Sequence, residues 1–491
     1  MRTIPILLYV AIVSLLGTGC NKWLDTQPSD QISDEKLYQN ADGFRTALNG
    51  VYQQVSVREL YGHHLTWGLA SVMSQDYDRN NLDYVNYYLA DYNYTQATYT
   101  VPVINGIWSK SYNAIANCNK IISAIEPLDS TFFPLLSAER NLILGEAMAM
   151  RGLLHFELLR LYAPAPAAQP QGYFIPYVSE YPARYTAPST TIGVMDSIIR
   201  DLETAQVLVA RNDTITNRTM MMYKLQSLMA GGNTPNGGLF FNYRMHRLNY
   251  VAIQGLLARA YLYKGDYVKA LEKADYLYKQ FSPAPSSRLK WWAWTASYSM
   301  TGADKYIKLV DDVIMAFYNP EEVNMIKAIK DQYSPFNLAD EFMTTWLPGN
   351  VRDYRMDFLG LSAENKKSPK WNETTSQSQW RKEQNFLMPV LRFSEIYLIY
   401  AETLFHAGRT TEALAVFNEF RYARGRTTAF NSTDPEAFYE ELLLEYRREF
   451  FEEGQTVFAH KRLNRPIMVG TRRIDIDQRL VLPIPEGETI F

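Results

Sequence analysis

The sequence predicts a mostly α-helical protein, in which helical hairpins form one large domain with long irregular loop insertions. Three observations lead to this prediction. Apolar residues recur three and four positions apart in several long segments, which is the spacing of one helix face. Two such segments are each followed by a glycine and a second helical segment, which indicates helix–turn–helix units. No Gly/Ser-rich or charged linker divides residues 20–491, so we expect them to form one domain.

Residues 1–19 have the layout of a lipoprotein signal peptide. Arg2 supplies a positive charge, residues 4–16 form an apolar run, and Gly-Thr-Gly at 17–19 provides a cleavage zone. At about 1.5 Å per residue, the run is too short to span a hydrocarbon core of about 30 Å comfortably. We expect cleavage before Cys20 and lipid attachment to it. Secretion with a free cysteine is the alternative, because glycine stands at position 17, where bacterial lipoprotein signals usually have leucine.

The only other cysteine, Cys118, is expected to be a small buried apolar residue rather than a reactive thiol.

Charge and hydropathy limit the classes of partner that the chain can bind. The formal net charge is −3 and the basic residues are dispersed, so no surface for nucleic acid is predicted. No segment after the signal is apolar enough to cross a membrane. Membrane attachment is therefore expected through the N-terminal lipid, and stable anchoring needs more than one acyl chain.

Helices are predicted in order along the domain. The segment 108–124 is expected to pair with 139–162, whereas 192–209 has no identified partner. Two later hairpins share small residues, since Ala258 aligns with Ala401 when their turn glycines are superposed. These hairpins comprise 253–261 with 266–281, turning at Gly265, and 393–404 with 411–424, turning at Gly408. Small residues at fixed offsets allow close helix packing, and the recurrence resembles the tetratricopeptide repeat.

Long insertions interrupt the helical pattern. They cover residues 60–103, 212–243, 282–306 and 350–386. Loops of this length in a compact domain are usually functional or disordered. Their tryptophan and tyrosine content indicates order in at least two of them.

One candidate ligand site is a tyrosine cluster in the first insertion. Tyr84, Tyr87 and Tyr88 crowd this segment, with Asp76 a few residues before them. An aromatic ring can cover the apolar face of a sugar while neighbouring polar side chains bind its hydroxyl groups. The alternative is that the rings pack the loop onto the helical body.

A second candidate is a tryptophan cluster in the third insertion. Trp291, Trp292 and Trp294 follow two prolines, with Arg288 beside them. Three tryptophans within four residues cannot easily all face inward, so we expect an exposed platform outside the core. A ligand would cover this apolar surface, which is otherwise unfavourable in water.

The sequence shows no motif for a metal, cofactor or nucleophile. His63 and His64 form the only adjacent histidine pair, and no metal-binding motif accompanies them. The glycine-rich stretch 231–238 lacks the Lys-Ser/Thr of a phosphate-binding loop. We therefore expect no cofactor and no metal. A glycosidase-type pair of carboxylates stays open among the 52 acidic residues.

Five motifs occur in order along the chain. They lie at 20–28, 145–162, 391–402, 447–462 and 482–485. The first reads Cys-Asn-Lys-Trp-Leu-Asp-Thr-Gln-Pro, and the third begins Leu-Arg-Phe-Ser-Glu-Ile-Tyr. Together they resemble the SusD/RagB family of outer-membrane nutrient-binding lipoproteins over nearly the whole mature sequence.

The resemblance implies a lipid-anchored outer-membrane protein that faces the cell surface and forms the lid of a SusC-type TonB-dependent transporter. It implies capture of oligosaccharide, or of peptide in the RagB-like branch, for import, and it implies no catalysis. Two other classes stay open, which are a cell-surface glycoside hydrolase and a helical-repeat scaffold that binds only protein.

The charged residues of the later motifs could be mistaken for an acid/base site. They are Arg392, Glu395, Glu402, Arg447, Arg448, Glu449, Glu453 and Arg462. Glu395 lies on the helix that carries the apolar stripe, and Glu402 directly follows Ala401. We therefore expect them to form partly buried ion pairs between the last helices.

Overall fold

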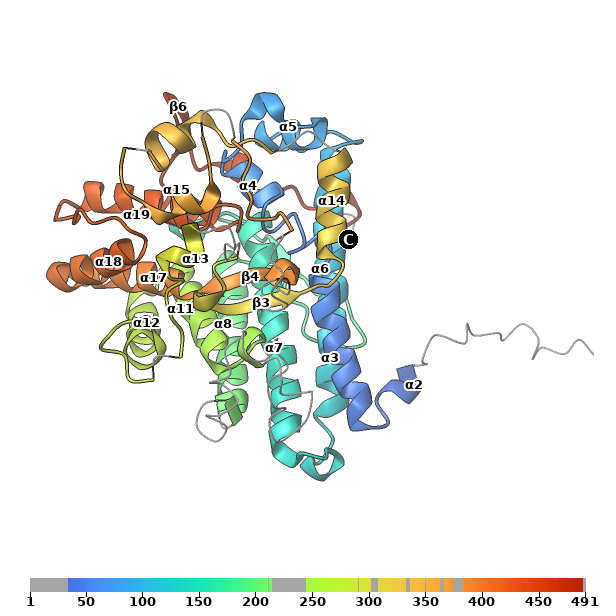
Figure 1. Cartoon of the computed structure of the whole chain (residues 1–491). Coiled ribbons are helices and arrows are strands. Elements are labelled where there is room, and N and C mark those ends of the chain that lie inside the picture. The colour runs from blue at the N-terminus through green and yellow to red at the C-terminus, as the bar shows by residue number, and fades with distance from the viewer. Residues whose placement is uncertain are drawn as a thin grey trace, which may run out of the picture.

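The computed structural model describes residues 34–488, except 211, 214–243, 290, 302–307, 333–335, 349, 363–365, 374–381 and 383. The predicted signal peptide and Cys20 lie outside the described residues, as does most of the insertion at 212–243. Helices dominate the fold and the strands are short, which confirms the predicted fold class (Figure 1). In the described part of the chain, no helix is both long and apolar enough to span a membrane.

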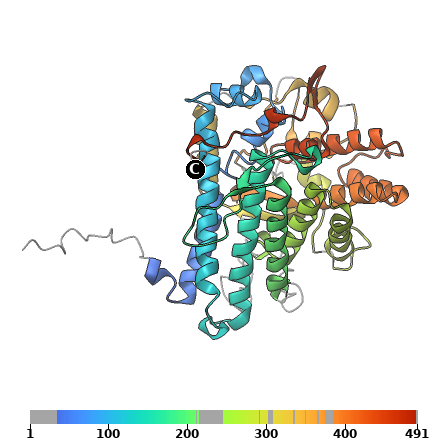
Figure 2. The same ribbon diagram turned by 180° about the vertical axis from the view of Figure 1, so that it is seen from behind.

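Long helices pack on one another in sequence order, and α6, α7 and α8 lie side by side (Figures 1 and 2). The series is α3 (Ala41–Val55), α6 (Thr100–Ile125), α7 (Leu136–Tyr162), α8 (Thr191–Ala210), α11 (Tyr250–Lys264), α12 (Tyr267–Phe281), α17 (Phe393–His406) and α18 (Thr410–Ala423). The expected pairing of α6 with α7 is confirmed. The sequence left α8 without a partner, and the structure places it between α7 and α11.

The two predicted hairpins, α11–α12 and α17–α18, turn at the expected glycines. Gly265 has a φ of +88° and Gly408 a φ of +75°, in the left-handed region that glycine adopts without steric cost. Asn249 and Asp266 precede α11 and α12, and each side chain accepts a hydrogen bond from a main-chain N–H of the first turn. These local signals explain why the sequence predicts both hairpins.

Shorter elements fill the space around this array. The helices are α2 (Asp34–Leu37), α4 (Leu69–Met73), α5 (Tyr84–Ala90), α13 (Ser297–Thr301), α14 (Glu322–Gln332), α15 (Tyr354–Leu359), α19 (Pro435–Glu449) and α20 (Thr456–Leu463). The strands form three antiparallel pairs, β1 (Ile175–Pro176) with β2 (Pro188–Ser189), β3 (Val313–Tyr318) with β4 (Leu387–Arg392), and β5 (Ile467–Val469) with β6 (Arg472–Ile474). The first insertion is described in full, and it contains α4 and α5 rather than only irregular chain.

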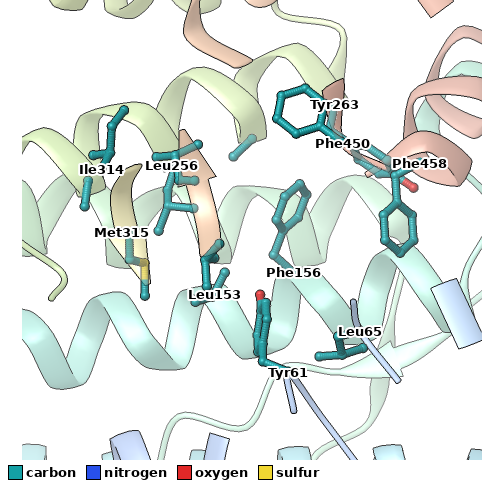
Figure 3. Packing of buried hydrophobic residues seen from close by; sticks show 14 of the residues in the cluster. Tyr61, Leu65, Leu153, Phe156, Leu256, Tyr263, Ile314, Met315, Phe450 and Phe458 are labelled. Atoms are coloured by element: carbon teal, nitrogen blue, oxygen red, sulfur yellow. The ribbon is translucent and has the colours of Figure 1, made fainter. Parts of the chain in front are cut away.

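One continuous hydrophobic cluster runs from α3 to the C-terminal segment. Helix α7 lies at its centre, and Figure 3 shows Phe156 of α7 between Tyr61 of the first insertion and Tyr263 of α11. The hydroxyl of Tyr61 donates to Glu157 Oε1 at 2.8 Å, so the only polar atom of that side chain is bonded inside the core. The core therefore holds the first insertion against the helical array.

Candidate functional site

Helix α5 presents tyrosines on one face. Asp83 caps the helix, because its Oδ1 accepts a hydrogen bond from Asn86 N at 3.0 Å. Tyr84, Tyr87 and Tyr88 are three and four positions apart and so share a face. Tyr84 is 70% exposed and Tyr87 37% exposed, whereas Leu89 is fully buried. In Figure 1, α5 lies at the top of the molecule, away from the ends of α7 and α8 at the bottom.

A fourth tyrosine completes this surface. The ring of Tyr99, which directly precedes α6, stacks on Tyr88 at a centroid distance of 5.6 Å and lies 5.8 Å from Tyr84. Tyr87 meets Tyr88 edge to face at 5.7 Å. We call Tyr84, Tyr87, Tyr88 and Tyr99 the tyrosine platform. Tyr99 was not predicted from the sequence, where its signal is the high tyrosine content of the insertion.

Polar side chains border the platform. The guanidinium group of Arg79 lies 4.4 Å from the centre of the Tyr87 ring and pairs with Asp91 at 2.9 Å. Asp78 caps the short turn that carries Arg79, and Asn80 in the same turn is exposed. Aromatic faces beside charged and amide groups can hold a sugar ring and its hydroxyls, or a peptide with an aromatic or polar side chain.

Two further tyrosines of the insertion face inward and hold it in place. The hydroxyl of Tyr92 donates to Met73 O at 2.9 Å, and that of Tyr94 donates to Arg479 O at 2.5 Å. Burial raises the pKa of both phenols, so they stay neutral donors. The alternative of packed rings therefore holds for these two tyrosines, whereas Tyr84 and Tyr87 of the platform are exposed and Tyr88 and Tyr99 are half-buried.

Asp76 does not lie on the exposed face, which corrects its prediction as a ligand-binding residue. Its side chain is only 1% exposed and pairs with Arg447 at 3.5 Å. Burial raises the pKa of Asp76 to about 7, against the opposing charge of Arg447. Its main-chain oxygen accepts from Ala339 N at 3.0 Å, so Asp76 supports the insertion from inside.

The expectation that the tryptophan cluster is exposed is wrong. Trp291 and Trp292 are buried, and both rings pack against Phe281 at the end of α12. Trp292 also packs on Phe393 at the start of α17, and its Nε1–H donates to Val313 O at 2.7 Å. The segment lies between the end of α12 and the start of α17, and both rings are buried there.

Trp294 is half-buried and completes the same arrangement. Its ring lies 4.8 Å from Tyr397 and 5.9 Å from Phe420, and the guanidinium of Arg424 lies 4.7 Å from the ring centre. Arg288 is exposed, and its main-chain N–H donates to Lys279 O of α12 at 2.9 Å. The three tryptophans of this cluster therefore pack into the helical body, and Arg288 is tied to α12 through its main chain.

The charged residues of the family motifs form buried ion pairs, as expected. Glu402 accepts two hydrogen bonds from Arg462, at 2.5 and 2.7 Å, which join α17 to α20. Glu395 pairs with Arg259 at 2.5 Å, so its partner lies on α11 and not, as the sequence predicts, on one of the last helices. Arg392, Arg448, Glu449 and Glu453 belong to one cluster, in which Glu449 contacts three arginines. Arg447 pairs instead with Asp76 of the first insertion. These carboxylates are held by cations and bind the fold together.

The other candidate groups are buried as well. His63 and His64 are 2% and 5% exposed, and burial lowers the pKa of His64 to about 3, with Arg58 adding to the shift. Cys118 is fully buried, and burial raises the pKa of its thiol to about 12, which favours the inert thiol. Among the described residues, no group of three or more His, Cys, Asp or Glu is placed to hold a metal ion.

Comparison with known proteins gives consistent matches. Residues 22–220 match the SusD-like family described as starch-binding and associating with the outer membrane, and residues 362–473 match the SusD family. No curated protein matches the chain.

Solved structures share the fold over almost the whole chain. A SusD superfamily protein from Bacteroides thetaiotaomicron has a TM-score of 0.68 at 21% identity, covering 92% of this chain and 97% of its own. A SusD superfamily protein from Bacteroides vulgatus has a TM-score of 0.67 at 20% identity, with the same coverage of 92% and 97%. A SusD-like carbohydrate-binding protein from Bacteroides vulgatus has a TM-score of 0.66 at 18% identity, covering 92% and 96%.

Proposed function

The chain belongs to the SusD/RagB family, and from this premise we propose that it captures oligosaccharide at the outer membrane and delivers it to a SusC-type TonB-dependent transporter as its lid. The protein is proposed to be anchored through lipid on Cys20 and to face the cell surface. Peptide is the alternative ligand, as in the RagB-like branch.

The tyrosine platform is the observation that carries the ligand-binding part of this proposal. Four rings meet at α5 and the start of α6, and Tyr84 leaves 70% of its surface in contact with solvent. Exposed aromatic clusters bordered by polar groups are typical of recognition sites. Burial of the tryptophan cluster moves the proposed ligand surface to α5, and the platform is therefore where ligand is expected to bind.

Replacing Tyr84 and Tyr87 together by alanine is expected to weaken ligand binding at least roughly tenfold, since truncating a central aromatic anchor often costs about 2 kcal/mol. Both rings are exposed, so the midpoint of urea unfolding is expected to stay nearly unchanged. Retardation in native gels containing amylopectin, dextran, xylan or galactomannan, followed by titration calorimetry with the retarding glycan, measures the affinity.

The matched control replaces Tyr185 and Tyr298, which are 73% and 76% exposed and lie outside the platform. This variant is expected to bind as the unchanged protein does.

The glycan is also expected to keep its length during the titration. Product formed in proportion to protein, and lost on substitution of one acidic residue, would favour the glycoside hydrolase instead. A ligand panel in which only peptides bind would favour the peptide branch.

Cys20→Ser is expected to release the protein from outer-membrane fractions, because the lipid is proposed to be the only anchor. Fractionation with immunoblotting measures the distribution of the protein between membrane and soluble pools. If the variant stays with the membrane after a high-salt wash, the lipid-anchor proposal is wrong.

A transporter partner is expected to co-purify with the unchanged protein in gentle detergent, giving a complex far larger than the 56.6 kDa of the chain alone. Affinity capture from native membranes and mass spectrometry identify the partner. Repeated capture without any TonB-dependent transporter would contradict the lid role while leaving ligand binding untouched.

A further inference from the structure

A hollow of about 450 Å³ lies between the chain that follows α7 and the C-terminal segment, and its lining includes none of the platform residues. Its size is within the range of small-molecule binding sites, roughly 300–1,000 Å³. Its walls come from residues 164–174 and 476–481, which are far apart in the sequence. Leu482 N donates to Leu161 O at 2.9 Å, so the two walls are joined by main-chain bonding beside the hollow.

The inner surface is largely apolar and the edge is polar. Pro164, Pro170 and Phe174 line one wall and Val481 the other, and each of these is half-buried. Proline rings and a phenyl face offer flat apolar contacts of the kind that the C–H face of a pyranose can cover.

Exposed amides stand at the edge of the same hollow, from Gln171 on one wall and Gln478 on the other. Across the part of the chain that the structure covers, the Gln478 side chain makes no hydrogen bond, so its amide can serve an incoming ligand. Amide groups donate and accept, which matches the hydroxyl groups of a sugar.

The charged groups that line the hollow already have partners. Lys461 Nζ donates to Arg160 O at 2.6 Å and to Leu480 O at 2.7 Å, which fixes the end of α7 to the C-terminal segment. The Asp477 carboxylate is bound by Arg479 Nε at 2.9 Å. Burial and the charge of Arg160 lower the pKa of Lys461 to about 7, which further reduces its positive charge. A neutral ligand therefore suits these walls better than a charged one.

The hollow is directly connected to the segment that carries the tyrosine platform. Tyr94 lies four residues after α5 and its hydroxyl bonds to Arg479 O at 2.5 Å, and Arg479 lies between the lining residues Gln478 and Val481. One wall of the hollow is thus held by the same insertion that presents the platform rings.

We propose that this hollow is a second carbohydrate subsite, which takes a neutral sugar unit of the oligosaccharide that binds at the tyrosine platform. The inference rests on the proposed function. Two subsites on connected segments would favour long, uncharged glycans over short or acidic ones, because a ligand held at one subsite meets the other at high effective concentration.

Filling the hollow tests this inference. Ala168 is exposed and lines the hollow, whereas its neighbour Ala167 is exposed and does not line it. Ala168→Trp is expected to weaken binding of the neutral glycan that retards the protein in native gels roughly fivefold or more. Ala167→Trp is the matched control, and its affinity for that glycan is expected to be unchanged. Binding is measured by native-gel retardation and titration calorimetry with amylopectin, dextran, xylan and galactomannan, and with polygalacturonate as the acidic probe.

The outcomes separate the two proposals. If no glycan binds the unchanged protein, the proposed carbohydrate function fails. If a neutral glycan binds and both tryptophan variants bind it equally well, the second subsite is overturned while the function stands. If polygalacturonate binds as tightly as the neutral glycans and Ala168→Trp weakens its binding, the assignment to a neutral ligand is overturned. Should Ala168→Trp lower the unfolding temperature strongly, Gln478→Ala supplies the same comparison, since that amide is exposed and its loss is expected to weaken binding without unfolding the chain.

Discussion

Glu449→Gln is expected to lower the free energy of unfolding by about 3–5 kcal/mol, because it removes the negative charge that three buried guanidinium groups share. Glu449 Oε1 accepts from Arg392 Nη1 at 2.5 Å and from Arg424 Nη2 at 2.7 Å, and its Oε2 accepts from Arg355 Nη1 at 3.2 Å. All four side chains are buried. Glutamine has almost the same shape, so the expected loss reflects uncompensated positive charge rather than an empty space.

Urea unfolding, monitored by circular dichroism, measures this change in free energy. In a thermal scan the melting temperature is expected to fall by roughly 3–5 °C, given the unfolding entropy of a chain of this size. The control is Glu412→Gln, which breaks an ion pair with Arg409 at 2.7 Å between exposed side chains. Exposed pairs contribute about 0–1 kcal/mol, so the control is expected to stay close to the unchanged protein. Equal effects of the two substitutions would contradict a stabilising role for the buried cluster.

The same cluster predicts how stability changes with pH. Burial alone acts to raise the pKa of Glu449, but Arg424 and Arg392 outweigh it, so the pKa lies well below its usual value of 4.5. Glu445 behaves alike, with its pKa lowered to about 2 by Arg355 and Arg448 against burial. The unfolded chain therefore binds protons first as the pH falls, and stability present above pH 4.5 is lost towards pH 2. Glu449→Gln is expected to make this decline less steep.

Trp292→Ala is the second substitution with a large expected effect, a loss of about 3–5 kcal/mol in the free energy of unfolding. The ring is 2% exposed and packs 5.2 Å from Phe393, so alanine leaves a cavity between α12 and α17. The substitution also removes the donor to Val313 O and leaves a buried carbonyl without that hydrogen bond.

Tyr298→Ala is the matched control, since it removes an aromatic ring that is 76% exposed and lies six positions further along the same insertion. Its unfolding midpoint is expected to change little. Both variants are also titrated with the glycan that binds the unchanged protein, and folded Trp292→Ala is expected to retain its affinity. If Trp292→Ala leaves the unfolding midpoint unchanged but abolishes glycan binding, the ligand site lies at the tryptophan cluster.

The sequence predicts the parts of this molecule that depend on near neighbours in the chain. Helices α11, α12, α17 and α18 follow from apolar residues three and four positions apart, and the turns within the two hairpins follow from Gly265 and Gly408. The shared face of Tyr84, Tyr87 and Tyr88 is local for the same reason, because helix periodicity alone places these rings together.

Only the tertiary structure decides which aromatic and charged residues reach solvent. Trp292 and Tyr84 both lie in insertions rich in aromatic residues, yet one fills a gap between two helix ends and the other stands on an outer helix face. Asp76 is likewise removed from solvent by Arg447, which belongs to the last part of the chain. The contact of Tyr99 with Tyr88 and the meeting of residues 164–174 with 476–481 depend on tertiary packing. Residue spacing along the chain does not predict either of them. Burial is a property of the packed chain, whereas residue spacing reports only on the helix or turn that contains it.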